Sequence, residues 1–156
     1  MSLQKVQNYF KQYHMEDRII VLEDSSATVE EAASALHTRK ARIAKTMSFL
    51  VDDQVNMIVM AGDVKIDNHK YKEVFHKKCK MVPYDQVEEK TGHQVGGVCP
   101  FALSDDIHVY LDDSLKRFST VFPAAGNSHS AIELTLDELA AYGHNTKWID
   151  VTKAIS

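Results

Sequence analysis

The chain has 156 residues, of which 44% are hydrophobic, so one domain with a substantial core is expected. A net charge of −4 excludes nucleic-acid binding driven by bulk positive charge, although it leaves room for a local basic patch. The sequence has two cysteines, no apolar run long enough to span a bilayer and no signal-peptide pattern, which favours a cytoplasmic protein without disulfides.

Hydrophobic periodicity and capping residues predict a mixture of helices and strands. Thr28 and Glu31 form a capping-box pattern, and Asp52 and Asp53 separate two apolar runs, which is typical of a β-hairpin. Because strands and helices do not alternate strictly, we expect an α+β fold: a single compact domain over 1–156 with a mixed, mostly antiparallel sheet and surrounding helices. The expected elements, in chain order, are a helix over 2–14, a strand over 18–22, a helix over 29–36, strands over 43–51 and 55–60, helices over 68–77 and 84–90, a strand over 107–111, a helical turn over 114–118, strands over 120–123 and 131–135, a helix over 136–142 and a strand over 148–151.

The most unusual segment is Gly96-Gly97-Val98-Cys99-Pro100-Phe101. Glycine permits positive φ and lets a ligand approach the main chain closely, and Pro100 stiffens the loop. Two interpretations are open: a loop whose backbone amides bind a substrate, or a tight structural turn between strands. We expect the Cys99 thiol to be packed and unreactive, because no known local motif places a histidine beside it.

Lys45 is the second candidate. It lies in the apolar segment 43–50, where a period of two places it on one face with Met47 and Phe49. Such a lysine either reaches solvent from an edge strand or provides a cation at the mouth of a pocket, where it would bind phosphate or carboxylate.

A lysine-rich strip runs over 65–80, with six lysines against two acids. The strip is typical of a solvated helix face, and it is also able to follow a phosphodiester backbone. The small polar loop over 125–130 either supplies amides and hydroxyls to a ligand or is an ordinary hairpin turn. No metal or cofactor is expected, because the histidines and cysteines lack zinc-ligand spacing and no phosphate-binding glycine motif occurs.

The order of these features resembles the YbaK/EbsC family of aminoacyl-tRNA deacylases, which is related to the editing domain inserted in bacterial prolyl-tRNA synthetases. The resemblance implies a partly barrel-like sheet and hydrolysis, in trans, of the ester that joins a wrong amino acid to the terminal adenosine of a tRNA. It covers the chain from about Asp24 onward and rests on Ile43-Ala44-Lys45-Thr46, Ala61-Gly62-Asp63, the loop from Thr91 to Phe101, Val109-Tyr110-Leu111-Asp112 and Ala125-Gly126.

The resemblance also implies roles for single residues. Lys45 matches the lysine that holds the phosphate or 3′ end of the tRNA, and the loop over 96–100 matches a Gly-x-x-x-Pro loop that binds the scissile end and positions water. Gly126 matches the glycine of a second substrate-facing loop, and Asp112 matches an aspartate with either a binding or a structural role. The implied site is Lys45, Gly96, Gly97, Val98, Cys99 and Pro100 for catalysis, Met47, Phe49, Phe101, Asp112, Gly126, Asn127, Ser128 and His129 for substrate binding, and Lys65, Lys70, Lys72 and Lys77 for tRNA binding.

The identity of the edited amino acid stays open. Met47, Phe49, Val98 and Phe101 are expected to wall a pocket that favours small side chains. In the branch that removes cysteine from a tRNA for proline, an aspartate stands where this chain has Ala131, and a tyrosine stands near its Leu22 and Glu23. Alanine, serine, threonine or another small residue is therefore compatible with the resemblance.

The implied partner is the acceptor end of a mischarged tRNA, such as one for proline, with an aminoacyl-tRNA synthetase as a possible second partner. An alternative is a non-catalytic module that binds tRNA or a synthetase through the same pocket. A small-molecule-binding protein with a pocket of related shape is a third interpretation.

Overall fold

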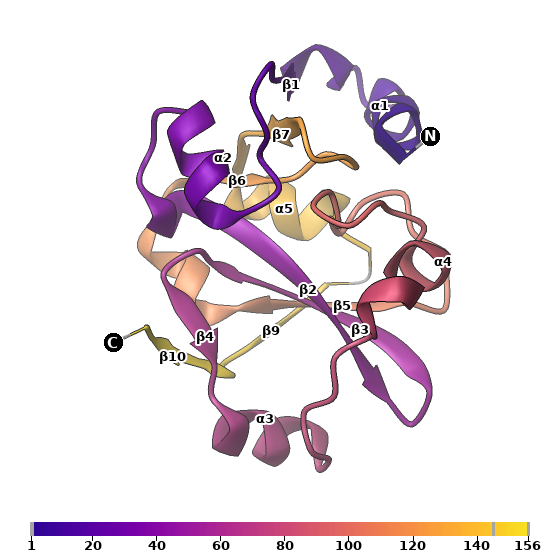
Figure 1. The fold of residues 1–156 in the computed structure, drawn as a ribbon, viewed down its shortest axis with the longest axis vertical. Coiled ribbons are helices and arrows are strands. Elements are labelled where there is room, and N and C mark those ends of the chain that lie inside the picture. Colours follow the sequence, from indigo (N-terminus) through magenta and orange to yellow (C-terminus); the bar gives the residue numbers. More distant parts are fainter. Residues whose placement is uncertain (1, 145, 156) are drawn as a thin grey trace.

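The computed structural model describes residues 2–144 and 146–155 and has the fold shown in Figure 1. In these described ranges, no helix is long and apolar enough to cross a membrane. The helices are α1 (Ser2–Lys11), α2 (Val29–Ala35), α3 (Asn68–Phe75), α4 (Val87–Thr91) and α5 (Leu136–Tyr142), and the 3-10 turns are η1 (Glu16–Arg18), η2 (Lys40–Arg42), η3 (Tyr84–Gln86) and η4 (Asp113–Arg117). The strands are β1 (Ile19–Val21), β2 (Ile43–Val51), β3 (Gln54–Ala61), β4 (Val64–Ile66), β5 (His108–Asp112), β6 (Thr120–Pro123), β7 (Ser130–Ile132), β8 (Leu134–Thr135), β9 (Lys147–Ile149) and β10 (Thr152–Ala154).

The central sheet is mixed and forms a half-barrel in a single compact α+β domain, as predicted. Its strand order is β8-β6-β2-β3-β5-β9. The β2–β3 and β6–β8 pairs are antiparallel, whereas β2–β6, β3–β5 and β5–β9 are parallel. Two antiparallel pairs, β1–β7 and β4–β10, lie outside this sheet. The predicted hairpin is confirmed, and Asp52 and Asp53 make its turn with φ values of 52° and 65°.

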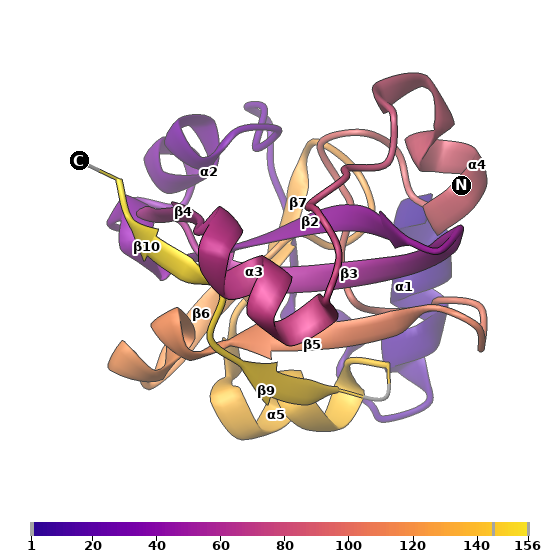
Figure 2. The ribbon, with the colours of Figure 1, turned by 90° about the horizontal axis from the view of Figure 1, so that it is seen from below.

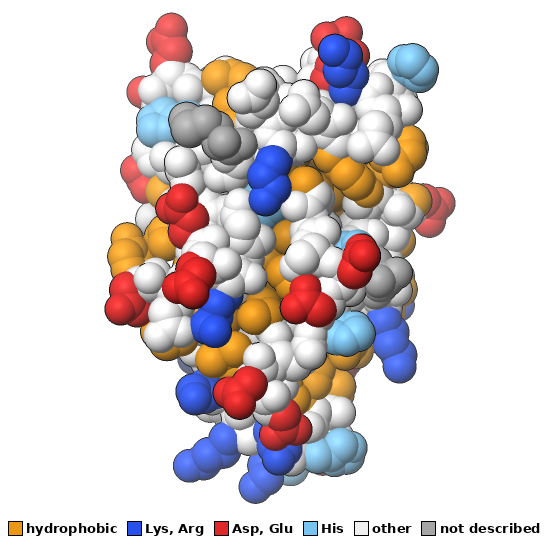
Figure 3. Space-filling view, turned by 90° about the vertical axis from the view of Figure 1, so that its right-hand side faces the viewer, with side chains coloured by type: hydrophobic (Ala, Val, Ile, Leu, Met, Phe, Trp, Pro, Cys, Tyr) orange, Lys and Arg blue, Asp and Glu red, His pale blue; other side chains and the backbone are white. Residues whose placement is uncertain are grey.

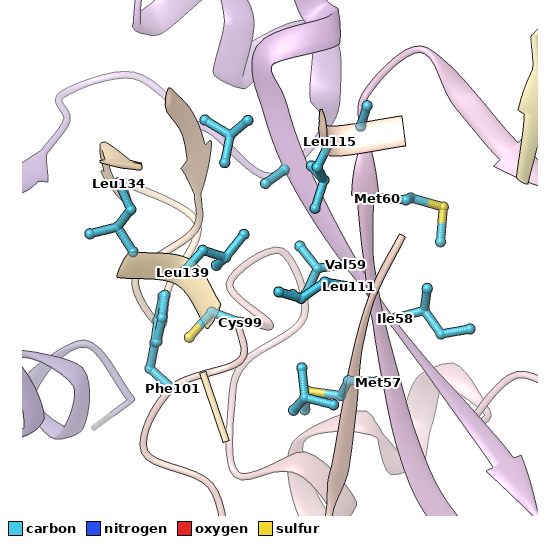
Figure 4. Close-up of a cluster of buried hydrophobic side chains, with 14 of the residues drawn as sticks. Met57, Ile58, Val59, Met60, Cys99, Phe101, Leu111, Leu115, Leu134 and Leu139 are labelled. Atoms are coloured by element: carbon cyan, nitrogen blue, oxygen red, sulfur yellow. The ribbon is translucent and has the colours of Figure 1, made fainter. Parts of the chain in front are cut away.

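The helices cover both faces of the sheet (Figure 2). On one face lies α3, whose Tyr71 ring lies 5.5 Å from that of Phe49. On the other face lie α1 and α5, where the rings of Phe10 and Phe101 make an edge-to-face contact with a centroid separation of 4.9 Å. Figure 4 shows the same alternation along β3, because Met57 and Val59 point toward Cys99 and Phe101 while Ile58 and Met60 point away.

Most predicted elements are confirmed, with shifted ends. The first helix ends at Lys11 and not at residue 14, because the Tyr13 and Met15 amides both donate to the Phe10 carbonyl and His14 has a positive φ of 59°. The strand predicted over 148–151 corresponds to β9, which runs over Lys147–Ile149. The range predicted for one strand over 131–135 contains part of β7 and all of β8. The sequence analysis missed β4 and β10, since each has three residues and depends on pairing with the other.

Candidate functional site

A cavity of about 560 Å³ opens along the outer edge of β2, and most of its wall is apolar. Figures 1 and 2 both place α2 and α4 beside this edge, at opposite ends of β2. The cavity lies between α2 and the segment that leads through η3 into α4. Its lining consists of residues 26–29, Ala32, Leu36, residues 43–48, residues 81–84, Val87, Val95, Gly96, Val98, Phe122, Ala124, Ser130 and Ala131.

The cavity exists because strand pairing is interrupted along the outer edge of β2. Strand β6 pairs only with Ile43 and Ala44, and the next contact is an isolated bridge between Phe49 and Met81. The Ser48 carbonyl accepts from Val82 N–H and Leu50 N–H donates to the Lys80 carbonyl, so these peptide groups point outward. Peptide groups alternate in direction along a strand, so those of Thr46 point into the same gap.

The hydroxyl of Thr46 is also unpaired. In the described part of the chain, its buried Oγ1 has no hydrogen-bond partner, and Thr46 borders the cavity. A buried hydroxyl without a partner is costly unless a ligand or water satisfies it. Thr46 therefore offers a ligand the peptide groups of an open strand edge, next to a buried hydroxyl that has no partner.

Lys45 lines the cavity and is half-buried. Its Nζ donates to the Val64 carbonyl at 2.5 Å, and none of the ion pairs within the described residues includes it. Burial lowers the pKa of its ammonium group, while the carboxylates of Glu30 and Asp63 oppose that shift. Lys45 is thus a cation without a direct carboxylate partner, placed to bind an anionic or strongly polar group.

The glycine loop also contributes to the cavity wall. Gly96 has a φ of +87° and, with Val98, borders the cavity. The Gly97 amide donates to the Gln94 carbonyl at 2.9 Å, whereas no hydrogen bond within residues 2–144 and 146–155 engages the amides of Gly96 or Val98. The loop therefore retains free amide donors beside the cavity, as an ester-binding backbone requires.

The second predicted loop supports the first one from behind. An ideal Cβ on Gly97 would lie 2.5 Å from the carbonyl carbon of Gly126, so the two glycine loops are in backbone contact. Gly126, with φ +109°, in turn packs on the Ser2 carbonyl. Asn127 Oδ1 accepts from His129 N–H at 3.0 Å, and the Ser128 hydroxyl lies 3.0 Å from His129 Nδ1. These four residues do not line the cavity, and their neighbours Ser130 and Ala131 line it in their place.

Cys99, Pro100 and Phe101 turn away from the cavity into the protein. Burial raises the pKa of the Cys99 thiol to about 12, so a thiolate nucleophile is disfavoured at neutral pH, in agreement with the prediction of an unreactive thiol. Phe101 is fully buried against Phe10, which corrects the expectation that it walls the pocket. Figure 4 shows Cys99 and Phe101 within the cluster of buried side chains.

His93 is a residue that sequence reasoning missed. It is fully buried, and its Nε2 lies 2.8 Å from the Phe101 carbonyl and 3.6 Å from Cys99 Sγ. A carbonyl oxygen only accepts, so Nε2 carries the proton and donates to it. This bond closes the base of the glycine loop, and the only signal in the sequence was a histidine eight residues before Phe101.

Two further predicted residues have structural positions. Phe49 is fully buried against Tyr71 on the α3 side of the sheet, so its placement in the pocket wall is corrected, whereas Met47 does line the cavity. Asp112 is buried outside the cavity lining, and its carboxylate accepts hydrogen bonds from Ser114 N–H at 2.9 Å, Val151 N–H at 2.9 Å and Thr152 Oγ1 at 2.7 Å. This aspartate joins η4 to Val151 and to the first residue of β10.

The lysines of the predicted strip form a basic surface outside the cavity lining. Lys and Arg side chains gather at the end of the molecule where α3 lies (Figure 3). Lys70 pairs with Asp150 at 3.1 Å and Lys77 with Asp52 at 3.1 Å, whereas Lys65 and Lys72 are exposed and have no ion pair among the described residues. In the same part of the chain, no group of three or more His, Cys, Asp or Glu is arranged to hold a metal ion.

Comparisons with known proteins identify the family of the chain. The sequence model of the aminoacyl-tRNA editing domain matches residues 23–142, so the chain belongs to that family, as the resemblance predicted. The uncharacterized protein YwhH of Bacillus subtilis is 51% identical over 154 residues, which cover 98% of each chain. The proline–tRNA ligase of Bacillus velezensis is 28% identical over 90 residues, which cover 57% of this chain and only 16% of that enzyme.

Solved structures show the same fold. One, described as a candidate trans-editing enzyme for prolyl-tRNA synthetase, superposes with a TM-score of 0.87 at 23% identity, covering 98% of both chains. The crystal structure of hypothetical protein APE2540 superposes with a TM-score of 0.83 at 28% identity, covering 96% of this chain and 99% of that one. The half-barrel with its helices on both faces is therefore the architecture of these proteins.

Proposed function

We propose that the protein is a trans-acting aminoacyl-tRNA deacylase, which hydrolyses the ester of a mischarged tRNA such as one for proline carrying a small wrong amino acid. The observation that carries this proposal is the pairing of Lys45 with the free amides of Gly96 and Val98 in the wall of one cavity. Membership of the editing-domain family supports the substrate class. The reaction would take place in the cytoplasm, where tRNA is charged.

The chemistry requires orientation more than a strong base. An aminoacyl ester is already activated, so holding water and the ester in line supplies much of the rate enhancement. Water attacks the carbonyl carbon, the bond from that carbon to the ribose oxygen breaks, and the ribose oxygen takes up a proton. The free amides of the glycine loop would stabilise the negative charge that develops on the carbonyl oxygen.

Lys45 would hold the substrate through its charge. A lysine ammonium is a compact cation on a flexible side chain. It is therefore suited to bind a phosphate, or a ribose oxygen adjacent to a phosphate. Thr46 would bind the α-amino group or the attacking water through its carbonyl, which points outward at the strand edge. The substrate's own ribose hydroxyl would take part in proton transfer, since Lys45 and Tyr84 are the only titratable side chains in the lining among the described residues.

The apolar part of the cavity wall would receive the amino-acid side chain. Ala131 and Val98 line the cavity, and neither brings a charge or a hydroxyl that would select a polar side chain. An apolar pocket discriminates small side chains by only about 10- to 200-fold per methylene. We therefore propose a small side chain, with alanine, serine, threonine and cysteine as the arms of the test.

The alternative function is a non-catalytic module that binds tRNA or a synthetase. It is favoured by one observation, the lack of a histidine or carboxylate in the cavity lining of the described residues. A panel of tRNAs charged with wrong amino acids distinguishes the two functions. Release of at least one amino acid above the uncatalysed rate supports the deacylase, and saturable binding with no release on any tRNA supports the module.

A further inference from the structure

The cavity mouth carries a group of exposed apolar side chains that the proposed ester chemistry does not use. Tyr84 is 77% exposed, Met81 52% and Val95 40%, and all three line the cavity. Five other large hydrophobic residues in the described chain are at least 36% exposed, and none of them lines the cavity. We call Met81, Tyr84 and Val95 the mouth platform.

The platform is held by the main chain, although its side chains are free. Met81 forms the bridge to Phe49, and the adjacent Val82 N–H donates to the Ser48 carbonyl at 3.1 Å. The turn η3 follows at once, with the Gln86 N–H donating to the Pro83 carbonyl. No hydrogen bond, ion pair or ring contact within the described residues involves the Tyr84 side chain. An aromatic ring fixed at its backbone and uncovered on its faces is prepared to stack on a planar group.

We propose that the mouth platform binds the unpaired base at the 3′ end of the tRNA, with Tyr84 stacking on it. This inference rests on the proposed function. An ester bound in the cavity is joined to the terminal ribose, and the base of that same nucleoside must therefore lie close to the cavity. Single-stranded RNA ends are recognised mainly by stacking on aromatic side chains. The platform lies in the wall of the same cavity as Lys45 and Gly96, so ester and base would occupy one continuous site.

Charge at the mouth indicates the course of the RNA backbone. Lys78 and Lys80 precede the platform, are exposed, and are free of ion pairs within the described residues. Asp85 and Glu88, which follow Tyr84 along the chain, are exposed in η3 and α4 and form an acidic flank. Phosphates would be attracted to the lysine flank and repelled from the acidic one, so the strand would approach past Lys80.

The test measures binding and needs no turnover. The probe is an uncharged fluorescent RNA hairpin with a single-stranded 3′ tail that ends in adenosine, and a second probe lacks only the terminal base. Wild type, Tyr84→Ala and Tyr84→Phe are compared by anisotropy at low salt, with Val21→Ala as the control because Val21 is 62% exposed on β1 and does not line the cavity.

We expect Tyr84→Ala to weaken binding of the complete probe about tenfold, because stacking of one base on an aromatic ring is worth that much or more. Tyr84→Phe keeps the ring and should restore the affinity, and Val21→Ala should match wild type. Removal of the terminal base should weaken binding to wild type but not to Tyr84→Ala. The proposal would be overturned if removal of the terminal base and Tyr84→Ala weakened binding independently, so that their effects multiplied. It would also be overturned if Tyr84→Ala weakened binding equally for a hairpin without a single-stranded tail.

Other occupants of the platform give different results. If a second copy of the chain covers it, sedimentation will show self-association that Tyr84→Ala abolishes, and the terminal base will have no effect. If the proposed deacylase function fails while the stacking proposal holds, no tRNA is hydrolysed but the terminal base still contributes through Tyr84. If stacking alone fails, deacylation persists and is indifferent to Tyr84→Ala.

Discussion

Replacing Gly97 by alanine should separate the two glycine loops without changing any group that faces the cavity. Gly97 has no positive φ, so an alanine is conformationally acceptable there, and the penalty comes from space alone. Its new Cβ would lie 2.5 Å from the Gly126 carbonyl carbon and closer still to the backbone nitrogen of Asn127, whereas ordinary contacts begin at 3.4 Å.

The magnitude follows from that overlap. The loops must part by about 1 Å, which would carry Gly96 and Val98 away from the ester position, and a misplacement of this size costs about a hundredfold in rate. Overpacking of a buried contact should also lower the free energy of unfolding by about 1–3 kcal/mol. The variant should therefore fold at 25 °C, be moderately less stable and deacylate about a hundredfold more slowly.

The assay is single-turnover release of the amino acid, with urea denaturation of the same preparations. Gly143→Ala is the matched control, because its Cβ would lie 2.8 Å from the Leu139 carbonyl oxygen at the end of α5, and Gly143 does not line the cavity. It should lose stability but little activity. If both variants lose activity in proportion to stability, or if Gly97→Ala is as active as wild type, the account of the loop contact is wrong.

Three further predictions concern the support of the fold and the titrating groups. Asp112→Ala leaves three buried donors without their acceptor, so the free energy of unfolding should fall by about 3 kcal/mol or more, and a loss under about 1 kcal/mol in urea titrations would contradict the structural role. The hydrogen bond from Arg18 lowers the pKa of Glu138 to about 2, below its ordinary 4.5. The ionised Glu138 therefore contributes to stability above about pH 4.5, and this contribution is lost as the pH falls toward 2. The difference in unfolding free energy between wild type and Glu138→Gln should shrink over that range, and a pH-independent difference would refute this role of Glu138. A thiol reagent followed by mass spectrometry should label the partly exposed Cys79 in the native protein and the buried Cys99 only in denaturant, whereas rapid labelling of native Cys99 would show that its loop opens.

The sequence predicted the fold class and most elements because periodicity and caps are local signals. Thr135 and Glu138 form a capping box at the start of α5, and Thr28 accepts from the Glu31 amide at the start of α2, so these boundaries are determined by nearby residues. The three-residue strands β4 and β10 escaped prediction because they are defined by pairing with each other across about ninety residues.

The site was predicted in part for a similar reason. Lys45, Met47, Gly96 and Val98 all line the cavity, since the alternation of a strand and the special backbone of glycine are visible in the sequence. Phe49 and Phe101 were misplaced because hydrophobicity does not distinguish a pocket wall from a core, and the sheet face of Phe49 is covered by α3. The contributions of Thr46 and Tyr84 depend on a gap in strand pairing that only the three-dimensional arrangement reveals.

The central claim is that Lys45 and the glycine loop act together on an aminoacyl ester. The most direct measurement is the single-turnover rate of amino-acid release, on the tRNA from the panel that reacts fastest, for wild type, Lys45→Ala and the exposed-lysine control Lys11→Ala. Loss of a preorganised charge at the reacting centre should slow Lys45→Ala by about a hundredfold or more, while Lys11→Ala keeps the wild-type rate. Equal rates for all three proteins, with Lys45→Ala fully folded, would contradict the claim.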